Sequence, residues 1–245
     1  MSAVKKFLAS VGAAGLALAG AVPALADTDA KGQSSIDPAG PAAQHIRDLW
    51  MIVTIPALIV LLAVGGAIIY AAFRFKERDP KFMPKQIGGN NAMEFTWTVI
   101  PALVLFILFG ISVPQMFYLR HSPAPTGLHI TVYGQRYSWS FLYPNVKKEV
   151  FDGSVLYIPA GQPVNLDIKS KDVIHSFSVP RLAGRLDAIP GQTNTLWLQA
   201  DQPGTYYGQC TELCGTGHAT MLVTVKALSA ADWQAWYTKL QRGGR

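Results

Sequence analysis

Charge is scarce in this chain, and two long stretches have none at all. Charged residues make up 15% of the 245 residues, whereas hydrophobic residues make up 50%. This imbalance favours insertion of part of the chain into a membrane over a wholly soluble protein. The uncharged stretches are therefore the candidate membrane-spanning segments.

Cysteine is scarcer still, because the chain has only 2, and both lie in residues 210–214. No Cys-x-x-Cys-His motif occurs, which excludes covalent attachment of a c-type haem. A basic run interleaved with aromatic residues is also missing. The formal net charge of +6 comes largely from residues 74–85 and from Lys5 and Lys6. We therefore expect no nucleic-acid partner.

The N-terminus is typical of a secretory signal peptide over residues 1–26. Lys5 and Lys6 precede an apolar stretch, and Ala24-Leu25-Ala26 forms a small-x-small cleavage pattern. No cysteine follows the apolar stretch, which excludes a lipoprotein signal; a short membrane anchor is the alternative. Residues 27–48 are small and polar, and they predict a flexible periplasmic lead.

Two uncharged stretches, residues 49–73 and 95–119, predict a transmembrane helical hairpin. Each has 25 residues, about 37 Å as a helix, which exceeds a hydrocarbon core of roughly 30 Å. The connecting loop, residues 74–94, is rich in Lys and Arg, and such loops stay in the cytoplasm. We therefore expect a two-pass protein of the bacterial inner membrane, in contact with lipid, with residues 120–245 in the periplasm.

The periplasmic part has the pattern of an all-β sandwich or Greek-key barrel over residues 120–228. Short runs with β-strand character are separated by Gly, Pro, Asn and Asp. The predicted strands are residues 137–141, 155–158, 163–169, 176–179, 193–198, 205–208 and 219–225. Ser229 and Asp232 then form a capping pattern that predicts a C-terminal helix and tail over residues 229–245.

The segment between the last two predicted strands concentrates metal-binding side chains: Cys210, Cys214, His218 and Met221. Thiolate and thioether are soft ligands, and soft ligands select copper over zinc, magnesium or calcium. In the periplasm, a disulfide between the cysteines is the simpler alternative. A disulfide, however, would leave His218 and Met221 without a role.

One more imidazole would complete a copper site, and His175 at the start of a predicted strand is the best candidate. Structural zinc sites use Cys and His but not Met. A mononuclear blue-copper site uses one Cys, two His and a weak Met, so it would leave the second Cys unused. Two thiolates can instead bridge two copper ions with one His for each. Such a centre transfers single electrons and has no open position for a substrate.

At these residues the chain resembles subunit II of the haem-copper cytochrome c oxidases. The segment from Tyr207 to Gly215, followed by His218 and Met221, is similar to the family's dinuclear copper A motif. The stretches 172–179 and 187–191 and the two-helix anchor resemble the family as well. The resemblance implies a membrane-anchored all-β protein with a cupredoxin-like Greek-key β-barrel.

The resemblance also implies a role for each ligand. Cys210 and Cys214 would bridge two copper ions. His175 and Met221 would bind one ion, and His218 and the backbone carbonyl of Glu212 the other. The side chain of Glu212 would reach a magnesium ion at the boundary with the catalytic subunit; the alternative is a carboxylate at the rim of the site.

Three further residues are similar to functional positions of the family. Glu94 resembles the carboxylate near the cytoplasmic entrance of a proton pathway, although an acid at a helix end is often only an interfacial charge. Tyr137 stands where the family has the tryptophan that takes up electrons, and Trp139 matches the following tryptophan. The sequence leaves open which of these two is the electron entry point.

The resulting expectation is an electron-entry subunit of a proton-pumping terminal oxidase. It would accept electrons from a periplasmic donor such as cytochrome c and pass them to haem in subunit I, where oxygen is reduced to water. Subunits I and III are the expected partners. The alternative is a copper-binding electron-transfer or copper-carrier module outside a terminal oxidase. A quinol oxidase subunit of the same architecture would lack the copper ligands.

Overall fold

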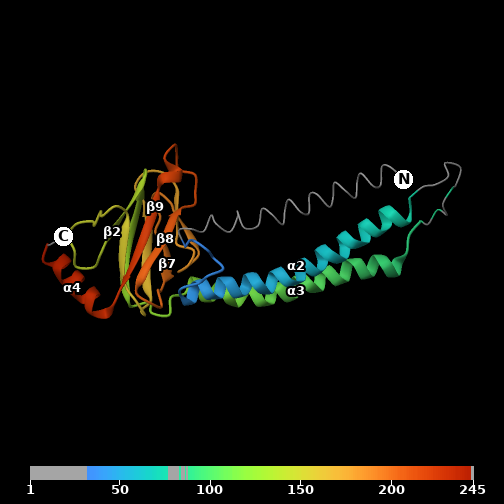
Figure 1. The fold of residues 1–245 in the computed structure, drawn as a ribbon, viewed down its shortest axis with the longest axis horizontal. Coiled ribbons are helices and arrows are strands. Elements are labelled where there is room, and N and C mark those ends of the chain that lie inside the picture. The colour runs from blue at the N-terminus through green and yellow to red at the C-terminus, as the bar shows by residue number, and fades with distance from the viewer. Residues whose placement is uncertain (1–31, 77–82, 84–85, 87, 244–245) are drawn as a thin grey trace.

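The computed structural model describes residues 32–76, 83, 86 and 88–243, and the predicted signal peptide lies outside them. Two long helices run side by side away from a β-domain that carries a short C-terminal helix (Figure 1). The hairpin and the β-domain are therefore distinct regions. The fold class expected from the sequence is confirmed.

The hairpin consists of α2 (Pro41–Arg74) and α3 (Asn91–Arg120), both long and apolar enough to cross a membrane. Helix α3 begins at Asn90, whose side chain accepts a hydrogen bond from the backbone N–H of Met93. Pro56, Pro101 and Pro114 lie inside the helices without ending them, as membrane helices tolerate. Both helices contain the predicted spans and extend beyond them.

The predicted flexible lead is wrong in its C-terminal part, because α2 already begins at Pro41. Before the helix, the backbone N–H of Ala39 donates to the carbonyl of Arg181 (2.7 Å), and the Ala39 carbonyl accepts from Asp201 (2.9 Å). Asp37 also pairs with Arg181 at 2.8 Å. Proline at the first helical turn favours this early start, and the backbone contacts fix the lead on the β-domain.

Two sheets form the β-domain. Strands β2 (Ser138–Leu142), β1 (Leu128–Gln135), β4 (Val164–Ser170) and β7 (Asn194–Leu198) make the first sheet in that order. The second sheet is β3 (Val155–Pro159), β9 (Leu222–Leu228), β8 (Gly204–Cys210), β5 (His175–Ser178) and β6 (Arg185–Ala188). The pairs β1–β4 and β3–β9 are parallel, and the other pairs are antiparallel.

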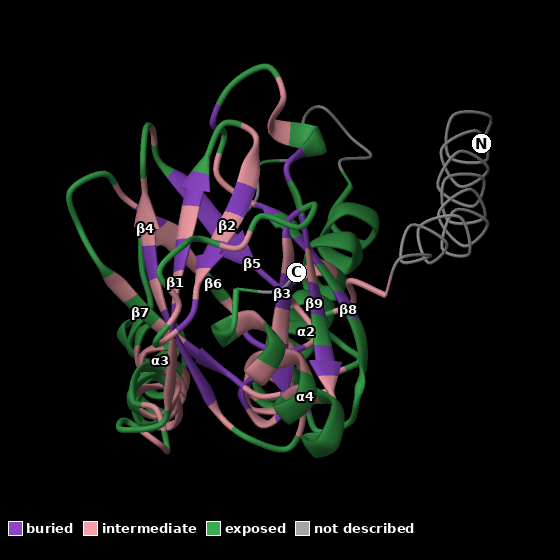
Figure 2. Ribbon diagram, turned by 90° about the vertical axis from the view of Figure 1, so that its left-hand side faces the viewer, coloured by how far each residue is buried: buried purple, intermediate pink, exposed green. Residues whose placement is uncertain are grey.

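The core lies between the facing sides of the two sheets, where buried segments are concentrated (Figure 2). Strand β9 alternates buried and exposed residues along its length, as expected for a strand with one face on a core. Strands β1 and β6 were not among the predicted strands. Strand β6 is only four residues long, and its sequence Arg-Leu-Asp-Ala has little strand character.

The C-terminal helix α4 (Ala230–Gln241) begins as predicted, with the Ser229 side chain accepting a hydrogen bond from the backbone N–H of Asp232. Its aromatic side chains cover one edge of the β-domain. Trp236 stacks on Tyr157 with ring centroids 4.6 Å apart, and Tyr237 donates to the carbonyl of Pro144 at 2.6 Å. The helix therefore belongs to the β-domain rather than to a free tail.

Strand pairing brings distant ligand candidates together. Strand β5 pairs with β8 so that Phe177 lies opposite Cys210, and β8 pairs with β9 so that Gln209 lies opposite Leu222. The strand that begins at His175 therefore runs beside the strand that ends at Cys210. The short 3-10 helix η2 (His218–Thr220) lies in the connection between β8 and β9.

Candidate metal centre

The two cysteines are free thiols, buried at the end of β8 and in the loop that follows. Their sulfur atoms lie 4.0 Å apart, twice the roughly 2.05 Å of a disulfide bond. The Cys210 thiol donates to the carbonyl of Glu212 at 3.3 Å. The arrangement leaves both sulfur atoms available to a metal, and the disulfide alternative is not what the structure contains.

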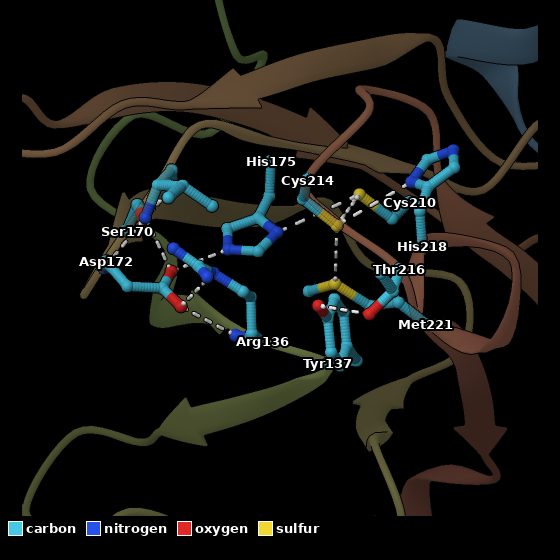
Figure 3. Close-up of polar contacts among 11 residues, drawn as sticks. Arg136, Tyr137, Ser170, Asp172, His175, Cys210, Cys214, Thr216, His218 and Met221 are labelled. Atoms are coloured by element: carbon cyan, nitrogen blue, oxygen red, sulfur yellow. Dashed lines mark hydrogen bonds and ion pairs between the residues drawn. The ribbon is translucent and has the colours of Figure 1, made fainter.

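His175 approaches the sulfurs from β5 and is fully buried. Its Nδ1 lies 4.0 Å from the Cys210 sulfur, and its Nε2 lies 2.7 Å from the Asp172 carboxylate. A carboxylate accepts a hydrogen bond but cannot donate one at neutral pH. Nε2 therefore donates a hydrogen bond to the carboxylate, and Nδ1 faces the cysteines (Figure 3).

His218 and Met221 complete the cluster from the other side. The Nδ1 atom of His218 lies 3.6 Å from the Cys214 sulfur. The Met221 sulfur lies 3.9 Å from the same Cys214 sulfur. The backbone N–H of Cys210 donates to the carbonyl of Met221 at 2.9 Å, which closes the loop at its two ends. Every predicted copper ligand is thus brought together, including the Glu212 carbonyl.

The donor set fits copper. Within the described residues, the ligand atoms of His175, Cys210 and Cys214 lie within 4.8 Å of one another, and the buried thioether of Met221 adjoins them. Burial and the charge of Cys210 raise the pKa of the Cys214 thiol to about 11. A soft metal ion that takes up the thiolates would relieve this cost.

Asp172 was not among the predicted site residues, although a carboxylate three residues before a candidate ligand histidine is a usable signal. Partial burial acts to raise the pKa of Asp172, but hydrogen bonds from the Arg136 backbone and the His175 ring outweigh it and lower the pKa to about 2. Asp172 is therefore a permanent anion beside the cluster at neutral pH.

Tyr137 and Trp139 occupy different environments. Trp139 is fully buried, with its ring 5.9 Å from that of His175, so an external protein cannot touch it. The Tyr137 hydroxyl lies 3.2 Å from the Thr216 hydroxyl at the protein surface. A Cβ atom at Gly215 or Gly217 would stand 2.5 Å from Tyr137 atoms, so these glycines make room for its ring against the ligand loop.

Glu94 lies far along the chain from this cluster, in the first turn of α3. Its Oε1 accepts a hydrogen bond from the backbone N–H of Asn90 at 3.2 Å. An acid in this position satisfies a free N–H group and interacts favourably with the helix dipole. The structure thus gives Glu94 a role in capping the helix, and its place in a proton pathway stays a prediction.

Comparison with known proteins gives a consistent family. The family model "Cytochrome C oxidase subunit II, transmembrane domain" matches residues 30–115, and "Cytochrome C oxidase subunit II, periplasmic domain" matches residues 152–228. Cytochrome c oxidase subunit 2 of Alkalihalophilus pseudofirmus is 40% identical over 211 residues, which cover 83% of this chain and 60% of that protein. The chain therefore spans less than two thirds of that relative.

A probable cytochrome c oxidase subunit 2 of Rickettsia bellii is 30% identical over 220 residues, covering 81% of this chain and 80% of that protein. Among solved structures, the periplasmic domain of subunit II of the Bradyrhizobium japonicum cytochrome oxidase is 29% identical, covers 48% of this chain and 96% of its own, and has a TM-score of 0.45. The chain belongs to the cytochrome c oxidase subunit II family.

Proposed function

We propose that the chain is the electron-entry subunit of a proton-pumping terminal oxidase and that its metal centre holds two copper ions. One observation carries this proposal. Two buried free thiols lie 4.0 Å apart, with one imidazole nitrogen beside each, 4.0 Å from Cys210 and 3.6 Å from Cys214. A mononuclear site would need only one of the two sulfurs.

In this proposal, Cys210 and Cys214 would hold both ions. His175 and Met221 would serve as further ligands of one ion, and His218 and the Glu212 carbonyl would serve the other. Copper held in this way supplies one-electron transfer, and ligands from the chain leave no position for a substrate. The burial of both sulfurs excludes bulk water from the centre, which keeps the reorganisation on electron transfer small.

Tyr137 is the proposed contact between donor and centre, because it is at the surface and its ring lies on the ligand loop. Trp139 would act from inside by packing against His175. Electrons would pass from a periplasmic donor such as cytochrome c through this region to haem in subunit I, where oxygen is reduced to water. In this proposal, the chain transfers electrons, and the reduction of oxygen takes place in subunit I.

Further parts of the proposal concern the surroundings of the subunit. The Glu212 side chain would bind a magnesium ion at the boundary with subunit I, and Glu94 would stand at the entrance of a proton pathway. The hairpin would lie in the lipid of the bacterial inner membrane beside subunit I, with subunit III in the same complex. The Lys- and Arg-rich connection between the helices supports a periplasmic position for the β-domain.

Electron paramagnetic resonance with metal analysis tests the proposal on the full-length chain in its oxidase complex. We expect two copper ions that share one unpaired electron, and reduction of the haem after the copper. Cys214→Ser should abolish the shared spectrum, whereas Thr216→Ser, which keeps a hydroxyl beside Tyr137, should retain it. A single copper ion with an unshared spectrum would contradict the dinuclear centre. Bound copper that never reduces haem would favour a copper carrier.

A further inference from the structure

A carboxylate stands directly behind one of the metal ligands. Asp172 precedes β5 by three residues, and its Oδ1 lies 2.7 Å from Nε2 of His175. The other ring nitrogen, Nδ1, is the one that faces the Cys210 sulfur. Asp172 therefore contacts the centre only through the imidazole, from the side opposite the sulfurs (Figure 3).

Asp172 is itself held by several donors. The backbone N–H of Arg136 donates to its Oδ2 at 2.9 Å, and the Arg136 guanidinium Nε lies 3.5 Å from the same oxygen. The backbone N–H of Val173 donates to Oδ1 at 2.7 Å. These contacts fix the carboxylate so that Oδ1 keeps facing His175. They also place a positive charge on the far side of the carboxylate.

The imidazole has no room to turn away from this partner. His175 is fully buried, and the indole of Trp139 packs edge-on against its ring. A Cβ atom at Gly134 would lie 3.1 Å from Cδ2 of His175 and 3.0 Å from Cζ3 of Trp139. The two rings thus fill the space over the backbone of β1. The packing and the hydrogen bond to Asp172 therefore together hold the ring in place.

We propose that Asp172 is a positioning residue that sets the reduction potential of the centre through His175, and that Arg136 limits this effect. The inference rests on the proposed copper function. A carboxylate that accepts the Nε2 proton fixes the tautomer and makes the imidazole a stronger donor. A stronger donor favours the oxidised, more positively charged centre and lowers its potential. The Arg136 guanidinium draws charge from the carboxylate and acts in the opposite direction.

The test compares three variants of the full-length chain in the oxidase complex by a redox titration followed by electron paramagnetic resonance. Asp172→Asn should move the potential to more positive values, because the amide still accepts the hydrogen bond but carries no charge. Arg136→Gln should move it to more negative values. Asp167→Asn is the matched control, since Asp167 lies 3.4 Å from His129, a histidine outside the centre, and it should leave the potential unchanged.

Copper affinity gives a second readout, measured by competition with a chelator. Mutation of such a partner of a ligand histidine costs about tenfold to a hundredfold in metal affinity, and because the neutral amide makes the imidazole a weaker donor, we expect a lower affinity for Asp172→Asn but not for Asp167→Asn. Shifts of opposite sign in Asp172→Asn and Arg136→Gln would support the proposal. Equal potentials and affinities in all three variants and the unmodified chain would overturn it.

Two further outcomes keep the interpretations apart. If the unmodified chain holds no copper, the proposed function fails, whereas normal copper with unchanged potentials defeats only the role of Asp172. If Asp172→Asn does not fold, Arg136→Gln still decides the matter, because it leaves the carboxylate in place. A potential that does not fall in that variant would contradict the proposal.

Discussion

The helical hairpin and the β-domain use the same apolar residue types in opposite ways. In α2 and α3, the most apolar 18-residue windows have mean hydropathies of 2.7 and 2.2, and none of their residues is buried inside the chain. In the β-domain, large side chains such as Trp139, Phe141 and Phe177 are fully buried. The β-domain therefore supplies its own apolar surroundings, whereas the described residues leave the apolar surface of the hairpin uncovered.

This difference decides where a precise site can be built. The candidate ligands lie on strands and loops whose side chains and backbone are fixed by packing, as in the contact between Trp139 and His175. The helices offer no such enclosure within the described part of the chain. Rigid, buried elements hold ligands at defined distances better than exposed ones.

The largest expected effect comes from shortening a buried tryptophan. Trp139→Ala should lower the free energy of unfolding of the β-domain by about 3–5 kcal/mol, because it leaves a cavity beside His175 and Phe177. The matched change in the hairpin is Trp97→Ala, at a side chain that is 60% exposed, and it should cost under about 0.5 kcal/mol of that stability. Urea unfolding of the full-length chain in detergent, followed by circular dichroism, measures both. Equal losses would remove the contrast between the two regions.

An intermediate effect is expected at the junction of the regions. A Cβ atom at Gly40 would lie 1.8 Å from the carbonyl oxygen of Gln199, so Gly40→Ala should displace the lead from the β-domain at a cost of about 1–3 kcal/mol. Faster proteolysis of the lead would report this displacement.

Gly65→Ala in α2 is the control for the junction. Apart from the neighbouring backbone of the helix itself, no atom of the described residues lies within 4 Å of the Cβ position at Gly65, and alanine favours a helix over glycine by about 0.5–1 kcal/mol. This variant should keep the proteolysis pattern of the unmodified chain. If Gly40→Ala also kept it, the junction would not depend on the close approach at Gly40.

The last expected effect concerns copper affinity rather than folding stability, and it is a pH dependence confined to the β-domain. Burial raises the pKa of the Cys214 thiol to about 11, so the thiol is protonated at neutral pH in the metal-free chain. Copper binds the thiolate and must release this proton, so the apparent affinity should rise about tenfold per pH unit for each proton released. Chelator competition between pH 6 and pH 8 measures the slope. An affinity that did not change over this range would show that the Cys214 thiol is already ionised.

The sequence was sufficient for the hairpin, because long uncharged runs have few other interpretations. It also placed the candidate ligands Cys210, Cys214, His218 and Met221 within one loop, and the structure brings these side chains together. Their distances depend on pairing between distant strands, such as β5 with β8. Local patterns do not determine such pairing, and the short polar strand β6 was missed for the same reason.

The division of roles between Tyr137 and Trp139 could not be read from their spacing. Alternation along β2 indicates that Trp139 lies on one face of the strand, but not which face is covered. Burial depends on the second sheet, whose Phe177 packs against Trp139, whereas Tyr137 is half-buried against a loop from another part of the chain. The close approach of Gly215 and Gly217 to the Tyr137 ring likewise depends on the folded structure, because the two glycines are far from Tyr137 in the sequence.

The attachment of the lead to the β-domain has a consequence for the order of events during synthesis. Asp37 is bound through its carbonyl by the Arg181 side chain, 144 residues further along the chain. The lead and both helices leave the ribosome before Arg181, Gln199 and Asp201 do. The contact of Asp37 with Arg181 therefore cannot form until the later strands have been synthesised and folded. Its formation is a late step in the maturation of the subunit.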